Sequence, residues 1–206
     1  MRLSKLMISQ HSRIIILILL VLANTAYGLV NGEKAPAFSL FSHSGKKVSL
    51  SDFKGRIVVL EWFNKGCPFV KKFYESRAMQ EWQREFTFKN VIWLTISSSS
   101  SGKQGYETAK QTTATRQRFN INSSHNLLDH DGRVGKLYGA VTTPHIFILD
   151  KQHRLAYQGA VDSITSIEMA DIAKADNYLT AALDELISEK DIKIKRTRPY
   201  GCSVKY

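Results

Sequence analysis

Two hydrophobic patterns follow one another in the first half of the chain. Residues 57–62 and 91–96 are almost wholly apolar and rich in β-branched side chains, as expected for strands covered on both faces. Between them, apolar side chains recur at three- and four-residue spacing from Val70 to Phe86, which predicts an amphipathic helix. Pro68 suits the first turn of that helix, because its missing N–H has no intrahelical partner there. The pattern therefore predicts a strand, a helix and a second strand.

The other patterns extend this arrangement into one α/β domain without internal repeats. Alternating strands and helices, followed by a hairpin and a final helix, predict a three-layer α/β/α sandwich with a mixed central sheet. The further predicted elements are a strand pair with a turn in 32–50, a brief helical turn at 51–52, a helix over 103–119, a strand at 126–129, a short helix at 134–138, a hairpin of 145–150 and 155–158, and a helix over 178–187.

The N-terminus has the pattern of a secretory signal peptide. Basic residues precede the uninterrupted apolar run 14–23, and Ala26 and Gly28 supply small residues for a cleavage site. An uncleaved membrane anchor is the alternative, but a run of this length spans about 15 Å as a helix, half of a hydrocarbon core of roughly 30 Å. We therefore predict that residues 1–28 are removed and that the mature protein is secreted across the inner membrane into the periplasm, with no membrane span.

Charge limits the choice of partners. The formal net charge is +11, and removal of residues 1–28 lowers it to +8, because three basic residues and no acidic residue are lost. Part of the excess lies in residues 189–206, a basic tail that also carries Cys202. Nucleic acid is a poor partner for this tail, because export separates the two and Tyr200 and Tyr206 are its only aromatic side chains. We favour a solvated tail that helps solubility or attracts anionic partners.

The chain has two cysteines, Cys67 and Cys202, and Cys67 stands where a predicted strand gives way to a predicted helix. The free N–H groups and the dipole at a helix N-terminus stabilise a thiolate, which is the nucleophilic form of sulfur. Lys65, Lys71 and Lys72 add positive charge nearby. We therefore expect Cys67 to be an ionised and accessible nucleophile. Because the periplasm is oxidising, a disulfide between two cysteines can also persist there.

Several short motifs follow one another in a fixed order along the mature chain. They are Trp62 with Cys67-Pro68-Phe69-Val70, Asp131-Gly132, Tyr138-Gly139, Thr142-Thr143-Pro144-His145, Tyr157-Gln158-Gly159-Ala160 and Tyr200-Gly201-Cys202-Ser203-Val204-Lys205. The ordered set resembles the thioredoxin fold and, within it, the peroxiredoxin-like branch of the redoxin superfamily (alkyl hydroperoxide reductase and thiol-specific antioxidant). The resemblance covers residues 32–206 and implies that residues 29–188 form a thioredoxin-like redoxin domain.

The resemblance to thioredoxin assigns roles to three positions around the cysteine. Trp62 matches the tryptophan five residues before the nucleophile, and Cys67 matches the first cysteine of the C-x-x-C pair. Val70 stands where the second cysteine belongs, so the usual local dithiol cycle is not available. Cys202 is then the internal thiol left to resolve a mixed disulfide, on a tail long enough to reach back over the site.

The match to the true peroxiredoxins is poorer. Their nucleophile follows a proline and a threonine, seven and three residues earlier, and the threonine hydroxyl orients the peroxide. Here Leu60 and Asn64 occupy those two places. Asn64 can hydrogen-bond a polar substrate, but the peroxide-activating arrangement is missing. Slow reduction of peroxide by an activated thiolate remains chemically reasonable.

Pro144 resembles the cis-proline of the thioredoxin fold. In that fold the residue before the proline lies beside the nucleophile, and its backbone pairs with an incoming extended peptide. The resemblance therefore implies that Thr143, Pro144 and the helix-start Pro68 contribute to substrate binding beside Cys67. His145 follows directly and has two interpretations, a proton-transfer group near Cys67 or a structural histidine at a strand start.

Three interpretations of the two cysteines remain open. In the first, Cys67 attacks a disulfide or a peroxide, and Cys202 resolves the product by forming a Cys67–Cys202 bond that an external reductant later opens. In the second, this bond is purely structural and closes a loop of about 135 residues, a stabilisation of roughly 5 kcal/mol in the chain-entropy model. In the third, Cys67 acts alone and an outside thiol resolves it.

We therefore predict an exported thiol-dependent oxidoreductase, a thiol-disulfide oxidoreductase or peroxiredoxin-like antioxidant that acts on protein disulfides or hydroperoxides. The resemblance implies a thioredoxin-like electron donor. The alternatives are a dedicated hydroperoxide peroxidase and a non-catalytic thioredoxin-fold binding module with a structural disulfide. The histidines show no zinc spacing and the sequence has no glycine-rich phosphate loop, so neither a metal nor an organic cofactor is expected.

Overall fold

The computed structural model describes residues 29–206. The predicted signal peptide, residues 1–28, lies outside the described residues. Within the part of the chain that the structure describes, none of the helices combines the length and the apolar character needed to cross a membrane.

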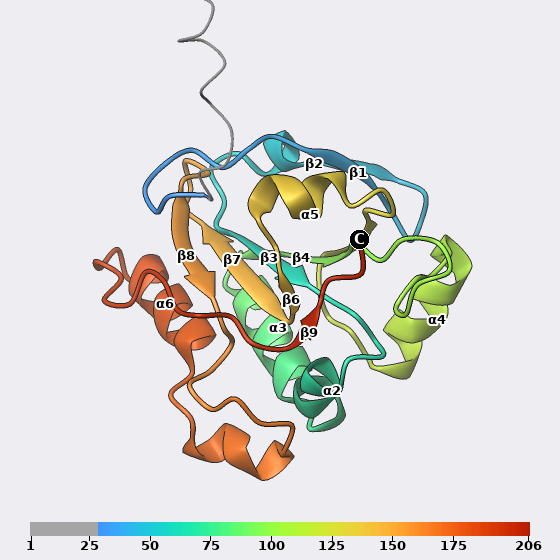
Figure 1. The fold of residues 1–206 in the computed structure, drawn as a ribbon. Coiled ribbons are helices and arrows are strands. Elements are labelled where there is room, and N and C mark those ends of the chain that lie inside the picture. Colours follow the sequence, from blue (N-terminus) through green and yellow to red (C-terminus); the bar gives the residue numbers. More distant parts are fainter. Residues whose placement is uncertain (1–28) are drawn as a thin grey trace, which may run out of the picture.

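A mixed sheet of seven strands forms the centre of the molecule (Figure 1). The strands are β1 (Ser39–Ser42), β2 (Lys47–Ser49), β3 (Val58–Trp62), β4 (Ile92–Ser97), β5 (His125–Leu128), β7 (His145–Leu149) and β8 (Leu155–Gly159). Their order is β2-β1-β5-β4-β3-β7-β8. Strand β4 pairs in parallel with β3 and β5, and the other neighbours are antiparallel. The predicted mixed sheet is thus confirmed, and the strands predicted at 57–62 and 91–96 are adjacent in it.

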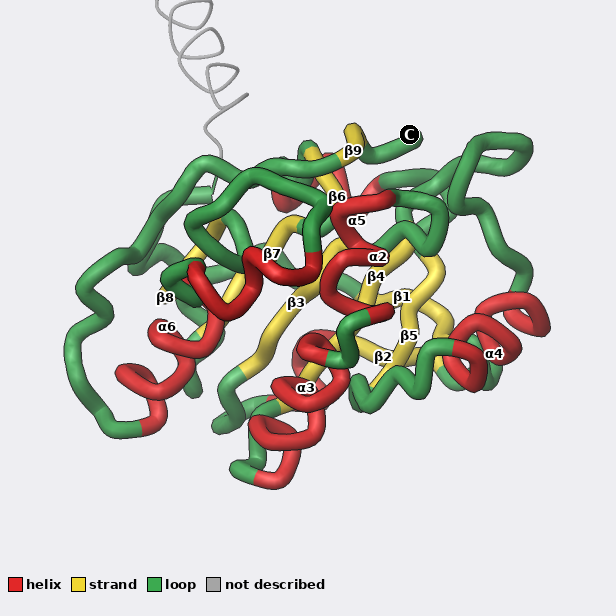
Figure 2. Tube along the Cα trace, turned by 90° about the horizontal axis from the view of Figure 1, so that it is seen from below, coloured by secondary structure: helices red, strands yellow, loops and turns green. Residues whose placement is uncertain are grey.

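Helices cover both faces of this sheet (Figure 2). The α-helices are α2 (Pro68–Glu75), α3 (Ala78–Phe88), α4 (Ala109–Arg118), α5 (Arg133–Tyr138) and α6 (Tyr178–Ile187), and the 3-10 helices are η1 (Leu50–Phe53) and η2 (Met169–Lys174). Helices α2, α3 and α6 contribute to the hydrophobic cluster on one face, while α5 and η1 pack on the other face. The predicted three-layer α/β/α sandwich is confirmed.

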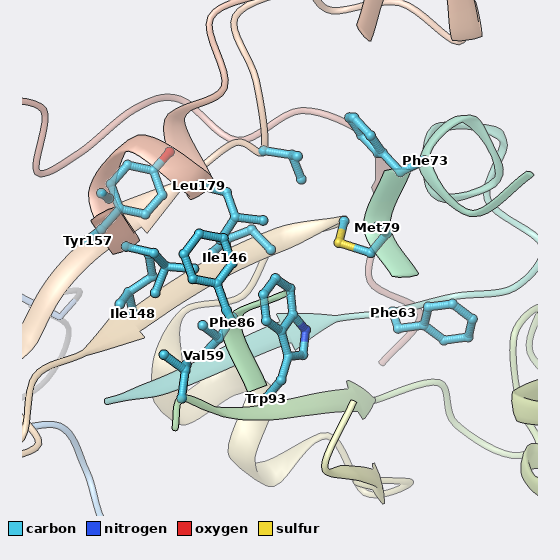
Figure 3. Close-up of a cluster of buried hydrophobic side chains, with 14 of the residues drawn as sticks. Val59, Phe63, Phe73, Met79, Phe86, Trp93, Ile146, Ile148, Tyr157 and Leu179 are labelled. Atoms are coloured by element: carbon cyan, nitrogen blue, oxygen red, sulfur yellow. The ribbon is translucent and has the colours of Figure 1, made fainter. Parts of the chain in front are cut away.

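Successive side chains of the central strands point to opposite faces of the sheet and form two separate cores. On one face, Trp93 packs in a cluster with Phe86 of α3 and Leu179 of α6 (Figure 3). On the other face, Leu94 belongs to a cluster with Tyr138 of α5. All of these side chains are buried. Apolar burial stabilises by about 25 cal/mol per Å², so the two cores hold the strands and helices that carry the site.

The prediction of one continuous helix from Pro68 to Phe86 is wrong, because the structure has two helices there, α2 and α3. Arg77 lies between α2 and α3 with a left-handed backbone, φ 68°. The Ser76 hydroxyl donates to the carbonyl of Phe73 at 3.0 Å and accepts from the N–H of Ala78 at 3.4 Å, which gives the backbone an alternative to the helical ladder. Both helices pack against the same core, which explains why the apolar period continues across the break.

The weak helix predicted over residues 103–119 is shorter than expected. Helix α4 begins after Thr108, whose hydroxyl accepts from the N–H of Gln111 at 3.3 Å, while the Gln111 side chain accepts from the N–H of Thr108 at 2.8 Å. This reciprocal cap fixes the start of the helix. The N-terminal strand pair, the short strand β5, the helix α5, the hairpin β7–β8 and the helix α6 match the predicted elements to within a few residues.

The C-terminal segment, residues 189–206, is docked on the domain and does not extend from it. Along β8, the Gln158 N–H donates to the Lys195 carbonyl and the Thr197 N–H donates to the Gln158 carbonyl, both at 3.1 Å. The segment, red in Figure 1, then crosses to form β9 (Cys202–Ser203). Strand β9 pairs antiparallel with β6 (Thr142–Thr143) in a second, two-stranded sheet. The sequence pattern predicted neither strand.

Candidate active site

Cys67 lies in the turn that leads from β3 to α2. It is the N-cap residue of α2, directly before Pro68 in the first helical turn. The Asn64 carbonyl accepts from the N–H of Cys67 at 3.0 Å, and the Asn64 side-chain oxygen accepts from the N–H of Gly66 at 2.8 Å. The strand-to-helix junction predicted from the sequence is therefore where the structure places the sulfur.

The amide of Asn64 is engaged entirely within the chain. Its nitrogen donates to the Gln104 carbonyl at 3.3 Å and to the Gln104 side-chain oxygen at 3.1 Å. Gly105 passes so close that an added Cβ would lie 2.5 Å from the amide of Asn64. The side chain is buried, and it ties the cysteine turn to the loop after β4. This placement favours a structural role over the predicted contact with a substrate.

Trp62 also lies beneath the site. It is fully buried, and its indole N–H donates to the Ser98 hydroxyl at 3.0 Å. Ser98 in turn donates to Asp129 at 2.6 Å, so a buried chain of hydrogen bonds supports the indole. The ring packs against Tyr138 and Phe147 on the α5 side of the sheet. Trp62 therefore fixes the end of β3, the strand that leads to Cys67.

Two of the lysines predicted to add charge near Cys67 are paired with carboxylates. Lys65 contacts Glu107 at 2.9 Å, and Lys72 contacts Asp162 at 3.1 Å. The second pair is buried on both sides. Their positive charge is therefore compensated locally, which leaves the helix N-terminus as the main favourable electrostatic feature beside the sulfur.

Thr143 and Pro144 lie directly against Cys67. The Thr143–Pro144 peptide bond is cis, as the resemblance implied. The Cys67 thiol donates to the Thr143 carbonyl, with an Sγ···O distance of 3.0 Å. Residues separated by 76 positions in the sequence thus meet at the sulfur.

Strand β9 brings Cys202 to the same place. Cys202 is paired in register with Thr143, and the N–H of Val204 donates to the Val141 carbonyl at 3.1 Å. Gly201 makes this approach possible, because its backbone has φ 139° and an added Cβ would lie 2.1 Å from the Thr143 oxygen. The position beside the cis-proline, where an incoming peptide was predicted, is occupied by the chain's own C-terminal strand.

The Cys202 thiol lies within hydrogen-bonding reach of the Cys67 side chain, and both cysteines are free. Burial, followed by the hydrogen bonding and charge of the neighbouring Cys67, raises the pKa of Cys202 to about 12. Cys202 is therefore a protonated thiol at neutral pH. Cys67 is 0% exposed, whereas Cys202 is partly exposed. The prediction that the Cys67 sulfur is accessible is wrong for this arrangement, because the chain folds over the site.

His145 is buried at the start of β7 and packs against Phe147. Burial, with a smaller effect of Arg196, lowers its pKa to about 3. Its Nδ1 atom accepts from the N–H of Val141 at 3.4 Å. An imidazole with so low a pKa stays neutral at physiological pH, so the structural interpretation of His145 is favoured over proton transfer.

Glu61 is a buried acid that the sequence interpretation did not single out. Its carboxylate accepts hydrogen bonds from Tyr74 at 2.8 Å, Gln83 at 3.1 Å and Trp93 at 2.8 Å. Burial raises its pKa to about 7, although the three donors lower it in part. The signal was present, because an acid in an otherwise apolar, doubly covered strand requires buried partners. Within residues 29–206, no group of three or more potential metal ligands is found.

The model of the AhpC/TSA family matches residues 31–158 of the chain. The chain belongs to the AhpC/TSA family. The matched region contains Cys67 and the cis Thr143–Pro144 bond but ends before Cys202. Family membership, together with a cysteine at the start of α2 beside a cis-proline, makes this member of the AhpC/TSA family a thiol-dependent oxidoreductase.

Relatives by sequence agree with this assignment, and solved structures agree with the fold. The chain is 30% identical to the thioredoxin-like protein YneN of Bacillus subtilis over 125 residues. This alignment covers 61% of this chain and 68% of YneN. It is 27% identical over 124 residues to the thiol-disulfide oxidoreductase ResA of Bacillus thuringiensis, covering 60% and 66%. A hypothetical protein of Sinorhizobium meliloti has a similar structure, with a TM-score of 0.74, 24% identity, and coverage of 87% and 96%. Thioredoxin-fold structures match as well, so the predicted thioredoxin fold is confirmed.

Proposed function

We propose that the mature protein is an exported thiol-disulfide oxidoreductase in which Cys67 attacks the substrate and Cys202 resolves the product. The observation that carries this proposal is the register of β9. It places Cys202 opposite Thr143, whose carbonyl contacts the Cys67 sulfur at 3.0 Å. A second thiol beside the nucleophile replaces the one that Val70 cannot provide.

The reaction follows from thiol-disulfide exchange. Because strand β9 covers the sulfur, β9 must first move away from Cys67. The Cys67 thiolate then attacks one sulfur of a substrate disulfide, which breaks the sulfur–sulfur bond and releases one substrate thiolate. Cys202, after loss of its proton, then attacks the Cys67 sulfur of the mixed disulfide and releases the second substrate thiolate. The substrate gains two electrons and two protons, and the protein is left with a Cys67–Cys202 disulfide. A dithiol donor, for which a thioredoxin-like protein is suitable, reduces that bond for the next cycle.

A protein disulfide suits this site better than a hydroperoxide. Leu60 and Asn64 stand at the places of the peroxide-orienting proline and threonine, and the Asn64 amide is committed to Gln104. The site therefore has no free hydroxyl at the position that orients a peroxide. The relatives named above, a thioredoxin-like protein and a thiol-disulfide oxidoreductase, support the same choice. Export rests on the signal-peptide pattern of residues 1–28.

The activity test compares the mature protein with Cys67→Ser in two assays, reduction of insulin disulfides and consumption of hydrogen peroxide, each with dithiothreitol as electron donor. We expect insulin reduction that Cys67→Ser abolishes and only slow peroxide consumption. Unchanged insulin reduction in Cys67→Ser would reject the assignment of the nucleophile. Rapid peroxide consumption without insulin reduction would favour the dedicated peroxidase, and inactivity of the wild type in both assays would favour the binding module.

A further inference from the structure

Tyr200, two residues before Cys202, is fixed to a buried carboxylate. Its hydroxyl donates to Asp162, whose same oxygen accepts from the N–H of Ile164 at 3.1 Å. The other Asp162 oxygen is 3.1 Å from the ammonium of Lys72. Burial, and secondarily Asp162, raises the pKa of Tyr200, which keeps its hydroxyl protonated as a donor. The tail is therefore tied down immediately before the cysteine.

The partner of this carboxylate belongs to the helix that carries the nucleophile. Lys72 lies on α2, five residues after Cys67, and its side chain is 0% exposed. It also donates to the carbonyl of Ile164 at 3.3 Å. A buried pair of this kind depends on complete hydrogen bonding, because leaving a buried charge unpaired is strongly destabilising. Its geometry is therefore well defined relative to α2.

The ring of Tyr200 also packs on α2. It meets the ring of Phe69 edge to face, with centroids 5.7 Å apart, and the Lys72 ammonium lies 6.0 Å from its centroid. Phe69, Lys72 and Cys67 thus come from the first two turns and the cap of one helix. The contacts of Tyr200 with Phe69 and Asp162 therefore hold the tail close to the helix that follows Cys67.

We propose that Tyr200 is the positioning residue of the redox pair: its hydroxyl, bound to the Asp162–Lys72 pair, holds Cys202 of β9 beside Cys67. This inference rests on the proposed function, because it concerns the efficiency with which the two thiols of that function join. The anchor raises the effective concentration of Cys202 at the Cys67 sulfur. It also keeps the tail closed over Cys67 in the reduced protein.

The first test measures how readily the pair forms in Tyr200→Phe. This substitution keeps the ring on Phe69 and leaves Asp162 bonded to Lys72 and Ile164, so the fold is retained. The protein dithiol is equilibrated with oxidised glutathione, which accepts two electrons and two protons and becomes two molecules of reduced glutathione. We expect the equilibrium constant for the Cys67–Cys202 disulfide to fall about tenfold, equivalent to about 30 mV.

The matched control is Tyr138→Phe, which removes a buried hydroxyl that donates to the Pro36 carbonyl at 2.6 Å, a hydrogen bond that does not involve residues 189–206. We expect its equilibrium constant to equal that of the wild type. An unchanged constant in Tyr200→Phe, or an equal fall in both variants, would overturn the proposal.

The second test follows alkylation of Cys67 by iodoacetamide in the reduced protein, read by mass spectrometry of the Cys67 peptide. Because the sulfur is covered, labelling requires the tail to open, and we expect labelling about tenfold faster in Tyr200→Phe than in the wild type and Tyr138→Phe. Equal rates in all three proteins contradict the anchor. If the wild type never forms the disulfide, the proposed function fails, and these rates still decide the role of Tyr200.

Discussion

Cys67 and Cys202 lie side by side, but different kinds of contact position them. Cys67 is held by its immediate surroundings, a fully buried strand before it and a helix that begins at Pro68 after it. Cys202 lies on a two-residue strand far along the chain, and side chains on either side of it hold that strand in place. The nucleophile is therefore positioned by local structure and its partner by long-range contacts, and we expect mutations in the tail to displace Cys202 while the turn of Cys67 stays in place.

The anchor after Cys202 differs in kind from the anchor before it. The Tyr206 hydroxyl donates to the Ala140 carbonyl at 2.6 Å, and the Lys205 carbonyl accepts from the N–H of Ser100 at 2.8 Å. Neither partner is charged, whereas Tyr200 binds the carboxylate of Asp162. Because hydrogen bonds to charged groups are roughly twice as strong, we expect the Tyr200 anchor to dominate.

The largest expected effect comes from removing the partner sulfur while leaving the scaffold of Cys67 intact. In Cys202→Ser, catalytic turnover in insulin reduction should fall about 1,000-fold, because an external thiol must replace one held at high effective concentration. The first half of the reaction should continue, so the mixed disulfide of Cys67 with the substrate accumulates and is visible by mass spectrometry. Full turnover without trapped adduct would show that Cys67 works with an outside thiol alone.

The next effect concerns the scaffold of Cys67. The pKa of Glu61 is about 7 in the folded protein against 4.5 when unperturbed, so between these values the folded chain retains a proton that the unfolded chain has lost. The free energy of unfolding should therefore fall as pH rises through this window, by about 3 kcal/mol in total. Glu61→Gln should flatten the slope, as measured by urea unfolding at pH 5, 6 and 7. An identical slope in both proteins would contradict the assigned pKa.

A smaller effect is expected when the close approach of β9 is blocked. Gly201→Ala places a Cβ against the Thr143 carbonyl at a positive φ, and the strain of about 2 kcal/mol should weaken formation of the Cys67–Cys202 pair about 30-fold. Gly45→Ala is the matched control, because Gly45 also has a positive φ but has nothing within 4 Å of an added Cβ. The measurement is the disulfide fraction at a fixed glutathione ratio. Similar losses in both variants would point to general backbone strain.

The smallest effect should follow from loosening the second anchor. Tyr206→Phe removes the hydrogen bond to Ala140 but keeps the ring over Gly132 and Gly135, so the loss is about 1 kcal/mol or about fivefold in the disulfide equilibrium. The same glutathione titration measures it beside Tyr200→Phe. If Tyr206→Phe has the larger effect, the ranking of the two anchors is reversed.

The contrast between the locally held Cys67 and the long-range contacts of Cys202 explains which features the sequence could predict. The strand ending at Trp62 and the helix beginning at Pro68 follow from local periodicity and proline chemistry, and the cis Thr143–Pro144 bond followed from the family resemblance. Strand β9 has two residues, too few for any period, and its partner is also a two-residue strand. The burial of Cys67 likewise depends on a segment about 135 positions away, so no local pattern contains it.

The sequence also did not predict the hydrogen-bond and ion-pair partners of the polar side chains around Cys67. The sequence showed Asn64 near the nucleophile, but its commitment to Gln104 depends on how the loop after β4 folds. In the sequence Lys72 looked like an ordinary surface lysine. Its buried contact with Asp162 joins residues that are 90 positions apart. Such pairs become visible only when the chain is folded, because charge alone does not identify the partner.

Non-reducing mass spectrometry of the mature protein, before and after mild oxidation with peroxide, tests directly whether Cys67 and Cys202 form a reversible disulfide. We expect a covalently linked pair of peptides containing Cys67 and Cys202, formed with the loss of two hydrogen atoms and fully reversed by dithiothreitol. Two cysteines that stay separate while Cys67 alone accumulates oxygen would contradict it.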